Sequence, residues 1–273
     1  MPFDFTNPAV LSWQISTYAL PASLQGYDSL AADNVDFGNW YGACGVYRNG
    51  QWVQLYTGQA YDNAWRANII TWIAQMQQAL HNLSHPLALI CNFAFGGLNP
   101  MDPQVLQAVS HMDGVVDEGG FTHFGEYDVT GSYWQQLNQL IETVQQENKP
   151  YYMIDQFSTQ SVDQSQIQWA LASYLMSKEH ASSLFVTTEQ GYGRAIWFNE
   201  YNAQIGSPTD SLYSSQNVYW RGYSNGLSLV NASASSTYTV TLNAGVPYHD
   251  LYGNLVGPTV TLPPHSGMVL LNS

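Results

Sequence analysis

Five short apolar runs in this chain each end in an acid or an amide, and this recurrence restricts its fold more than any other feature. The runs span residues 27–34, 87–93, 114–121, 151–157 and 183–190. Apolar runs of this length, separated by amphipathic stretches, are typical of buried parallel strands that alternate with helices. In a (β/α) barrel the carboxyl ends of the strands meet at the active site. We therefore expect one cleft lined by the polar residues at these strand ends: Asp33, Asn92, Asp117 with Glu118, Asp155 and Glu189.

The segments between the runs carry helical patterns. We expect helices near residues 9–20, 62–83, 103–112, 133–147 and 164–178, the first of them stopped by Pro21. Beyond residue 213 short alternating strands are separated by turn residues at 224–226 (Ser-Asn-Gly), 243–245 (Asn-Ala-Gly) and 252–254 (Tyr-Gly-Asn), which indicates a small antiparallel β domain. The sequence thus predicts a (β/α) barrel domain over residues 1–213 and a β domain over 214–273.

Charge limits the ligands that this chain can bind. Only 10% of the 273 residues are charged, with 6 Lys and Arg against 20 Asp and Glu and a formal net charge of −14. Nucleic acids require a basic patch, so the composition argues against them. Anionic membranes and acidic polymers such as pectin are disfavoured for the same reason. A neutral substrate fits this composition better.

The location of the protein is inferred from two further features. No apolar run approaches the roughly 20 residues of a membrane span, and no signal peptide is visible at the start of the chain. The few basic residues limit self-repulsion in acid, so we expect an acid-tolerant extracellular or cell-surface protein. A surface that has merely drifted toward amides is the alternative explanation.

Metal, phosphate and disulfide chemistry have little support in the sequence. The Cys and His residues lack zinc spacing, and neither a P-loop nor a dinucleotide-binding glycine motif follows a strand. We predict no metal and no cofactor. Cys91 lies inside an apolar run and is expected to be a buried thiol, although a disulfide with Cys44 stays open.

A cleft lined by carboxylates and aromatic residues points to glycoside hydrolysis, which uses two carboxyl groups beside the scissile bond. Asp33 is the candidate nucleophile because it ends a strand and Asn34 follows it with amide donors. Glu118 is the candidate acid/base because the two glycines after it leave room for a ligand. Asp117 alternates to the other face of its strand and is the reserve. Capping of the next turn is the alternative role for Asp33.

Substrate contacts are expected from two groups of residues. Hydrogen bonds to sugar hydroxyls are expected from polar strand ends, with loop capping as the alternative: Asn92, Asp155, Gln156 and Glu189. Stacking on sugar faces is expected from aromatic residues that follow the first two strands: Trp40, Tyr41, Phe93 and Phe95. Trp65 is a further stacking candidate, but its helical spacing with apolar neighbours favours the core. His123 could assist at the site, but a solvated loop is its expected place.

Three segments resemble a poorly characterised group of glycoside hydrolases with a (β/α) barrel and a C-terminal β-sandwich, similar to the α-galactosidase and α-amylase-like superfamilies. They are FDFTNPAVLSW leading into YDSLAADN, DGVVDEGGF, and YWRGYSNG continuing to GMVLL. The resemblance implies that Asp33 ends barrel strand four as the nucleophile. It assigns acid/base catalysis to Glu118, with Asp117 in reserve, and places FDFTN at the end of strand three.

The strand count leaves the barrel short. Five runs, or six with FDFTN, compare with the eight strands of a full barrel. Either two βα units precede Met1 in the natural protein, or the barrel is incomplete and a homo-oligomer, a partner chain or a rearranged N-terminus closes the gap. The sequence favours a retaining glycoside hydrolase acting on a neutral oligo- or polysaccharide. The alternatives are a non-catalytic carbohydrate-binding protein on the truncated scaffold and a structural or assembly protein.

Overall fold

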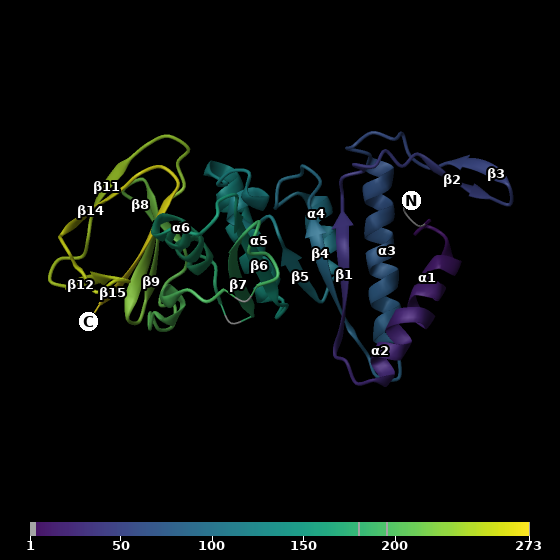
Figure 1. Ribbon diagram of the computed structural model, residues 1–273, viewed down its shortest axis with the longest axis horizontal. Helices are drawn as coiled ribbons and strands as arrows, with labels where there is room; N and C mark the ends of the chain where they lie inside the picture. The colour runs from purple at the N-terminus through teal and green to yellow at the C-terminus, as the bar shows by residue number, and fades with distance from the viewer. Residues whose placement is uncertain (1–3, 180, 195, 273) are drawn as a thin grey trace. The chain divides into compact units, whose positions relative to one another are not determined.

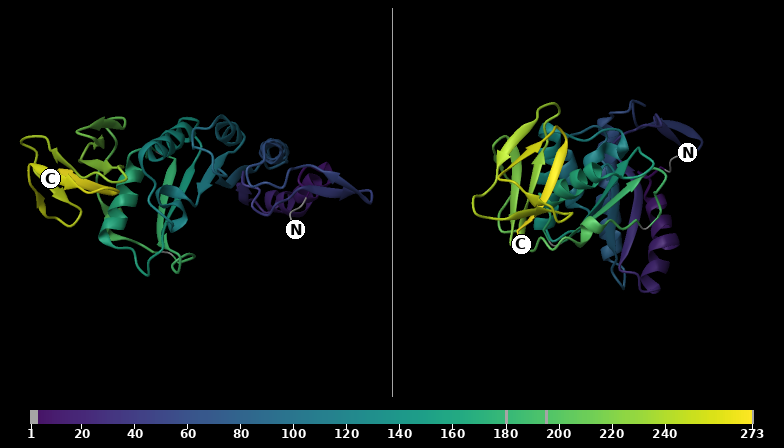
Figure 2. Two further views of the ribbon diagram at one scale, coloured as in Figure 1. Left: turned by 90° about the horizontal axis from the view of Figure 1, so that it is seen from above. Right: turned by 60° about the vertical axis from the view of Figure 1, so that its left-hand side comes forward.

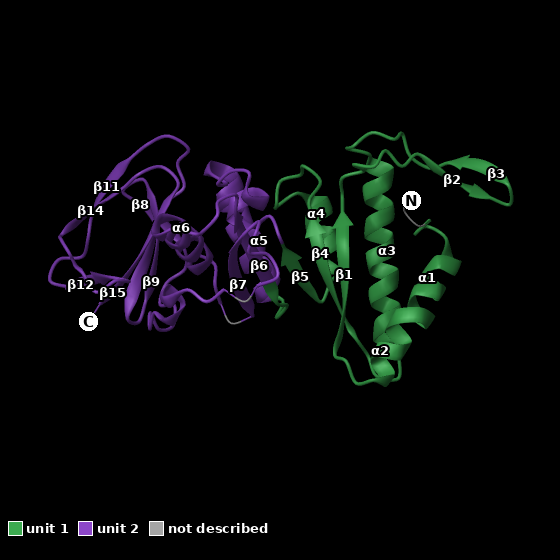
Figure 3. Cartoon of the chain, viewed as in Figure 1, with its two compact units in different colours: residues 1–117, 147–151 green, residues 118–146, 152–273 purple. Residues whose placement is uncertain are grey.

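The computed structural model describes residues 4–179, 181–194 and 196–272. The chain divides into two compact units, shown in different colours in Figure 3. Unit 1 comprises residues 1–117 and 147–151, and unit 2 comprises residues 118–146 and 152–273. The antiparallel strands beyond residue 213 share unit 2 with the helices before them, so the units do not divide where the expected domains do.

Unit 1 is an α/β structure with a parallel sheet in the order β1-β4-β5 (Figure 1). Its elements, in chain order, are α1 (Pro8–Gln14), the π-helical turn η1 (Ile15–Ala19), α2 (Leu20–Leu24), β1 (Ser29–Asp36), β2 (Gly45–Arg48), β3 (Gln51–Gln54), α3 (Asn63–His81), β4 (Ala88–Ala94), α4 (Pro103–Ser110) and β5 (Gly114–Asp117). Strands β2 and β3 form a hairpin that the sequence did not predict. Strands β1, β4 and β5 correspond to the first three predicted strands.

Two local expectations in unit 1 are wrong. Pro21 does not stop the first helix, because the π-helical turn before α2 lets the chain continue with Pro21 in the first turn, where no backbone donor is needed. The predicted strand at FDFTN is absent from the part of it that the structure describes. Residues 4–7 form a turn instead, in which the Asn7 N–H donates to the Asp4 carbonyl at 2.9 Å and Asn7 caps α1.

Helix α3 covers the sheet of unit 1 because its apolar residues recur at helical spacing. Its buried face includes Ile69, Ile73, Met76 and Leu80. Asp62 caps the helix by accepting from the Trp65 N–H at 3.0 Å. This cap fixes the start of α3, and with it the position of the Trp65 side chain.

Unit 2 contains the remaining βα elements and the antiparallel strands. In chain order they are η2 (Gly120–Gly125), α5 (Gly131–Gln146), β6 (Tyr151–Phe157, of which the first residue belongs to unit 1), α6 (Gln164–Leu175), β7 (Ser182–Thr188), η3 (Asn199–Asn202), β8 (Tyr213–Ser215), β9 (Val218–Tyr223), β10 (Gly226–Asn231), β11 (Tyr238–Thr241), β12 (Tyr248–Asp250), β13 (Leu255–Val256), β14 (Thr259–Leu262) and β15 (Ser266–Asn272). Strands β6 and β7 are neighbours in the sheet.

The antiparallel region after residue 213 is confirmed. A six-stranded sheet has the order β13-β12-β15-β10-β9-β8, and β11 pairs with β14 in a second sheet. These strands are drawn in light green and yellow near the C-terminus in Figure 2. Both sheets contribute to one apolar core that includes Trp220, Leu229, Val240 and Leu262. The region packs on helix α6. The contact is close at Gly267, where an added Cβ atom would lie 2.5 Å from the Ala172 Cβ atom. This packing places the β region and α6 in one unit.

The closed barrel is not found. Within the described residues, unit 1 holds three strands of the α/β sheet and unit 2 holds two, against the eight of a (β/α)8 barrel. Cys91 is buried and Cys44 is half-buried, and both are free thiols. In the described part of the chain, no helix combines the length and apolarity needed to cross a membrane.

Candidate functional site

Asp33 lies near the carboxyl end of β1, where the strand carries a bulge. The register with β4 shifts between Ala32 and Val35, and Asn34 adopts a left-handed φ of 54°. The bulge leaves the Asp33 side chain exposed. Its Oδ1 accepts from Asn92 Nδ2 at 2.8 Å, and its Oδ2 accepts from Asn34 Nδ2 at 3.1 Å. Two neutral amides therefore orient the carboxylate without neutralising its charge.

Asp36, at the end of the same strand, is bound more tightly by the protein. Its Oδ1 accepts from the Gly38 N–H at 2.6 Å, and its Oδ2 accepts from Trp40 Nε1 at 2.6 Å. Burial raises the pKa of Asp36, and these two hydrogen bonds oppose the rise. Asp36 is half-buried whereas Asp33 is exposed, and both of its donors lie in the loop that follows it, so we assign its carboxylate a structural role.

A cavity of about 750 Å³ in unit 2 and one of about 600 Å³ in unit 1 differ in their chemistry. The unit 1 cavity has both acids of β1 in its wall, together with four aromatic side chains that rank among the largest there: Trp40, Tyr41, Trp65 and Trp72. Trp40 is 54% exposed and Tyr41 is 93% exposed. Apolar walls with a few placed polar groups are what a saccharide site requires. We call this cavity the Asp33 cavity.

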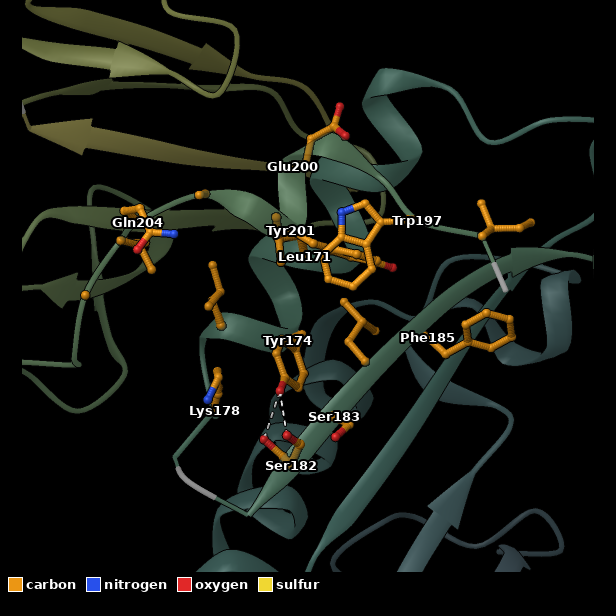
Figure 4. A pocket seen from close by; sticks show the side chains of 16 residues that line it. Leu171, Tyr174, Lys178, Ser182, Ser183, Phe185, Trp197, Glu200, Tyr201 and Gln204 are labelled. Carbon is orange, nitrogen blue, oxygen red and sulfur yellow. Dashed lines mark hydrogen bonds between the residues drawn. The ribbon is translucent and has the colours of Figure 1, made fainter. Parts of the chain in front are cut away.

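The unit 2 cavity has a different lining, shown in Figure 4. It lies along α6, the first half of β7 and the segment around η3, and its walls are mainly apolar. Two of its hydroxyls are used inside the protein: Tyr174 donates to the Ser182 carbonyl at 3.0 Å, and Tyr201 accepts from the Val186 N–H at 3.1 Å. None of the predicted catalytic carboxylates lines it.

Phe93 lies in the core rather than on a surface. It is 2% exposed and packs edge-on against Phe37, with ring centroids 4.9 Å apart, and against Phe95 at 5.6 Å. Strand β4 alternates between faces, so Asn92 points the other way and reaches Asp33. Phe93 and Phe95 are therefore removed from the stacking candidates, whereas Asn92 stays beside the proposed nucleophile.

Glu118 follows β5 and belongs to unit 2, where it is half-buried. The Tyr192 hydroxyl, from the turn after β7, donates a short hydrogen bond to Glu118 Oε1. Sequence reasoning missed Tyr192, because 74 residues separate the two partners and no local pattern links them. The position of Tyr192 just beyond a predicted strand end was the one available signal.

Asp117 and Asp155 have structural surroundings. Asp117 is 5% exposed and accepts from the Tyr151 hydroxyl at 2.8 Å. Asp155 is fully buried and accepts from the Phe121 N–H at 2.6 Å. A Cβ atom at Gly120, which has a φ of 49°, would lie 2.1 Å from Asp155 Oδ1. Asp155 therefore shapes the loop after β5 from beneath, and neither acid presents its carboxylate to a ligand.

Gln156 and Glu189 lie at the ends of β6 and β7. Gln156 Nε2 donates to the Phe124 carbonyl at 3.1 Å, so this amide supports the loop after β5. Glu189 is exposed and accepts from the Ser158 hydroxyl at 3.0 Å. Of these two, Glu189 keeps a carboxylate available for a substrate.

The loop after β5 has an unusual backbone. His123 and Phe124 have φ values of 43° and 60°, which are rare for residues with side chains. The His123 ring stacks on Tyr127 with centroids 4.4 Å apart, and Phe124 is 44% exposed. His123 is thus part of an aromatic surface and not only a solvated loop residue. The described residues contain no cluster of three or more His, Cys, Asp or Glu side chains suited to a metal.

Comparisons with known proteins give two findings. An α-amylase from Malbranchea cinnamomea matches with 14% identity and a TM-score of 0.44, over 99% of this chain and 61% of the amylase. This chain therefore spans about three fifths of that amylase. No curated protein matches.

A family model described as "Hypothetical glycosyl hydrolase family 15" matches residues 46–227, about two thirds of the chain. The matched segment includes Asn92 and Glu118 and begins after Asp33. The match confirms the resemblance to glycoside hydrolases expected from the sequence. The chain belongs to hypothetical glycosyl hydrolase family 15.

Proposed function

We propose that this protein is a glycoside hydrolase that acts on a neutral oligo- or polysaccharide outside the cell or at its surface. The observation that carries the proposal is the Asp33 cavity, in which an exposed carboxylate held by two amides lies in an aromatic wall. A saccharide presents apolar ring faces and hydroxyls, which match such walls. The net charge of −14 and the acids of β1 favour a neutral substrate over an anionic one.

The roles follow from the environment of each carboxylate. Asp33 is the proposed nucleophile, because the charge on its carboxylate is oriented but not neutralised. Glu118 is the proposed acid/base, with its carboxyl group oriented by the Tyr192 hydroxyl. Trp40 and Tyr41 offer exposed rings on which sugar faces can stack.

The proposed mechanism is retaining and has two steps. Asp33 Oδ attacks the anomeric carbon while Glu118 gives its proton to the departing glycosidic oxygen, which leaves as an alcohol. Glu118, now a carboxylate, then takes a proton from water as the water oxygen attacks the anomeric carbon. The bond to Asp33 breaks, and both carboxyl groups return to their starting states.

The proposal is tested by hydrolysis of neutral α- and β-linked oligosaccharides, with the anomer of the first product followed by NMR. We expect retention, and we expect a 2-deoxy-2-fluoro glycoside to label the peptide that contains Asp33. Asp33→Asn and Glu118→Gln should each lower kcat by about 10²–10⁴-fold or more. The matched controls, Asp28→Asn and Glu147→Gln, change exposed acids and should leave kcat unchanged. An inverted product would contradict the role given to Asp33.

A non-catalytic carbohydrate-binding protein is the second candidate. It is favoured by the five strands of the α/β sheet in the described residues, fewer than the eight of a complete barrel. Binding of neutral glycans without turnover, at both acid and neutral pH, would select this candidate over the hydrolase.

A further inference from the structure

The indole of Trp40 is exposed and yet held on several sides. Trp40 is 54% exposed, but its Nε1 donates to Asp36 Oδ2 at 2.6 Å. Its ring lies over Gly38, where a Cβ atom would be only 2.1 Å from Trp40 Cε2. Tyr61 contacts the same ring edge-on, with centroids 5.6 Å apart. The orientation of this ring is therefore set before any ligand arrives.

Tyr61, behind Trp40, is itself supported. The buried Arg66 guanidinium lies 5.8 Å from the centre of the Tyr61 ring and donates to the Gly96 carbonyl at 2.9 Å. Gly97 leaves room for Tyr61, since a Cβ atom there would be 2.7 Å from the ring. The support for Trp40 thus extends to the start of α3 and the loop after β4.

Asp36 contacts two of the three indoles that line the Asp33 cavity. Its side chain accepts from Trp40, and its backbone carbonyl accepts from Trp65 Nε1 at 2.9 Å. The second carboxylate oxygen accepts from the Gly38 N–H, which fixes the carboxylate plane. The Asp36 side chain therefore fixes Trp40, whereas Trp65 is held by the backbone whatever side chain position 36 carries.

We propose that Asp36 is a positioning residue whose carboxylate fixes the indole of Trp40 as the wall of a saccharide-binding subsite beside Asp33. Asp36 acts through this ring and sets the affinity for substrate, whereas it leaves the chemical step unchanged. A ring that is already ordered need not lose side-chain freedom when a sugar stacks on it. The nature of the ligand rests on the proposed function, but the coupling of Asp36 to Trp40 does not.

Asp36→Asn and Gly38→Ala test the proposal from two directions. An Asn at position 36 places an NH₂ group against one of two N–H donors and so releases either Trp40 or Gly38. Gly38→Ala keeps the carboxylate and pushes the ring away, because the three atoms nearest to the new methyl group all belong to Trp40. We expect each variant to raise KM for a neutral oligosaccharide by about 3–10-fold with kcat unchanged. This is the cost of ordering one side chain, here Trp40, when the ligand binds.

A double-mutant cycle separates action through Trp40 from a direct contact with substrate. Trp40→Phe keeps a ring but removes the N–H donor. If Asp36 acts through Trp40, Asp36→Asn should have little further effect on KM in the Trp40→Phe background. Full additivity of the two changes, or a fall in kcat with KM unchanged, would overturn the proposal.

A ligand-free readout distinguishes failure of this inference from failure of the proposed function. In protein labelled with 5-fluorotryptophan, the ¹⁹F resonance of Trp40 is identified by its loss in Trp40→Phe. It should shift or broaden in Asp36→Asn and Gly38→Ala and stay in place in the Asp28→Asn control. An unchanged resonance in both variants would refute the positioning role. The resonance could instead be altered in the variants while the unmodified protein binds none of maltotriose, cellotriose and xylotriose. That result would refute the saccharide subsite and the proposed function but leave the Asp36–Trp40 coupling intact.

Discussion

Arg221 gives the most quantitative prediction, because it is a buried cation whose partners are all defined. The side chain is 2% exposed and forms a short ion pair with Glu179. Its guanidinium also donates to the carbonyls of Leu175 at 3.1 Å, Lys178 at 2.8 Å and Asp210 at 3.1 Å. The first two carbonyls lie at and just beyond the end of α6, so Arg221 joins the C-terminus of that helix to β9.

Replacement of Arg221 by Met should destabilise the protein by about 3 kcal/mol. A hydrogen bond to a charged group contributes about 1.5–3 kcal/mol, and the change removes two of them, to the part-buried carbonyls of Lys178 and Asp210. The Leu175 carbonyl still accepts from the Tyr223 hydroxyl. Glu179 is 39% exposed, so Glu179→Gln should cost only about 1 kcal/mol or less. The contrast between the two variants is the core of the prediction.

Urea unfolding monitored by circular dichroism measures both losses at equilibrium. At about 2–4 °C per kcal/mol, Arg221→Met should also lower Tm by roughly 6–12 °C. Arg194→Met changes an exposed arginine and should stay within about 0.5 kcal/mol of the unmodified protein. A loss below about 1 kcal/mol for Arg221→Met at an unchanged m-value would refute the reasoning, as would an equal loss for Glu179→Gln.

Three further outcomes are expected. Burial alone would raise the pKa of Asp62, but hydrogen bonds from a threonine hydroxyl and from backbone N–H groups hold it below the usual value. The stability that Asp62 supplies is therefore present above about pH 4 and is lost as pH falls through the lowered folded-state pKa. Asp62→Asn should flatten the acid side of a plot of unfolding free energy against pH, and an unchanged acid side would contradict this. Tyr192→Phe should lower kcat by about tenfold in steady-state kinetics, with little change in KM, because Glu118 loses the hydroxyl that orients it. A kcat equal to that of the unmodified protein would show that Tyr192 has no role at the site. Burial raises the pKa of Cys91 to about 12, so a disulfide reagent should modify Cys44 alone in the native protein and both thiols in urea. Rapid reaction of Cys91 in the native protein would contradict this and show that the core opens.

The strands of the α/β sheet were predictable because their signal is local. The runs at 87–93 and 151–157 correspond to β4 (Ala88–Ala94) and β6 (Tyr151–Phe157) within one residue. Apolar residues in a short run between turn residues suffice to specify a buried strand. The FDFTN segment shows where such local patterns fail to predict a strand. Its two aromatic residues alternate as in a strand, but residues 4–7 form a turn closed at the Asp4 carbonyl, and Asn7 caps α1.

The roles of the strand-end residues were harder to predict, because adjacent residues on a strand point to opposite faces. Asn92 reaches Asp33, whereas its neighbour Phe93 enters the core. Asp117 and Glu118 divide in the same way, one buried under Tyr151 and the other contacted by Tyr192. A sequence pattern places such pairs at a strand end but does not choose between them.

The sequence alone determined the alternation of strands and helices, the antiparallel region after residue 213 and the acidic character that favours a neutral ligand. Only the tertiary structure decided which acids remain available for chemistry. Asp155 is engaged by the Phe121 N–H, 34 residues away, and Asp33 is oriented by Asn92, 59 residues away. The availability of a carboxylate depends on burial and on the donors around it, and folding supplies those donors from distant parts of the chain.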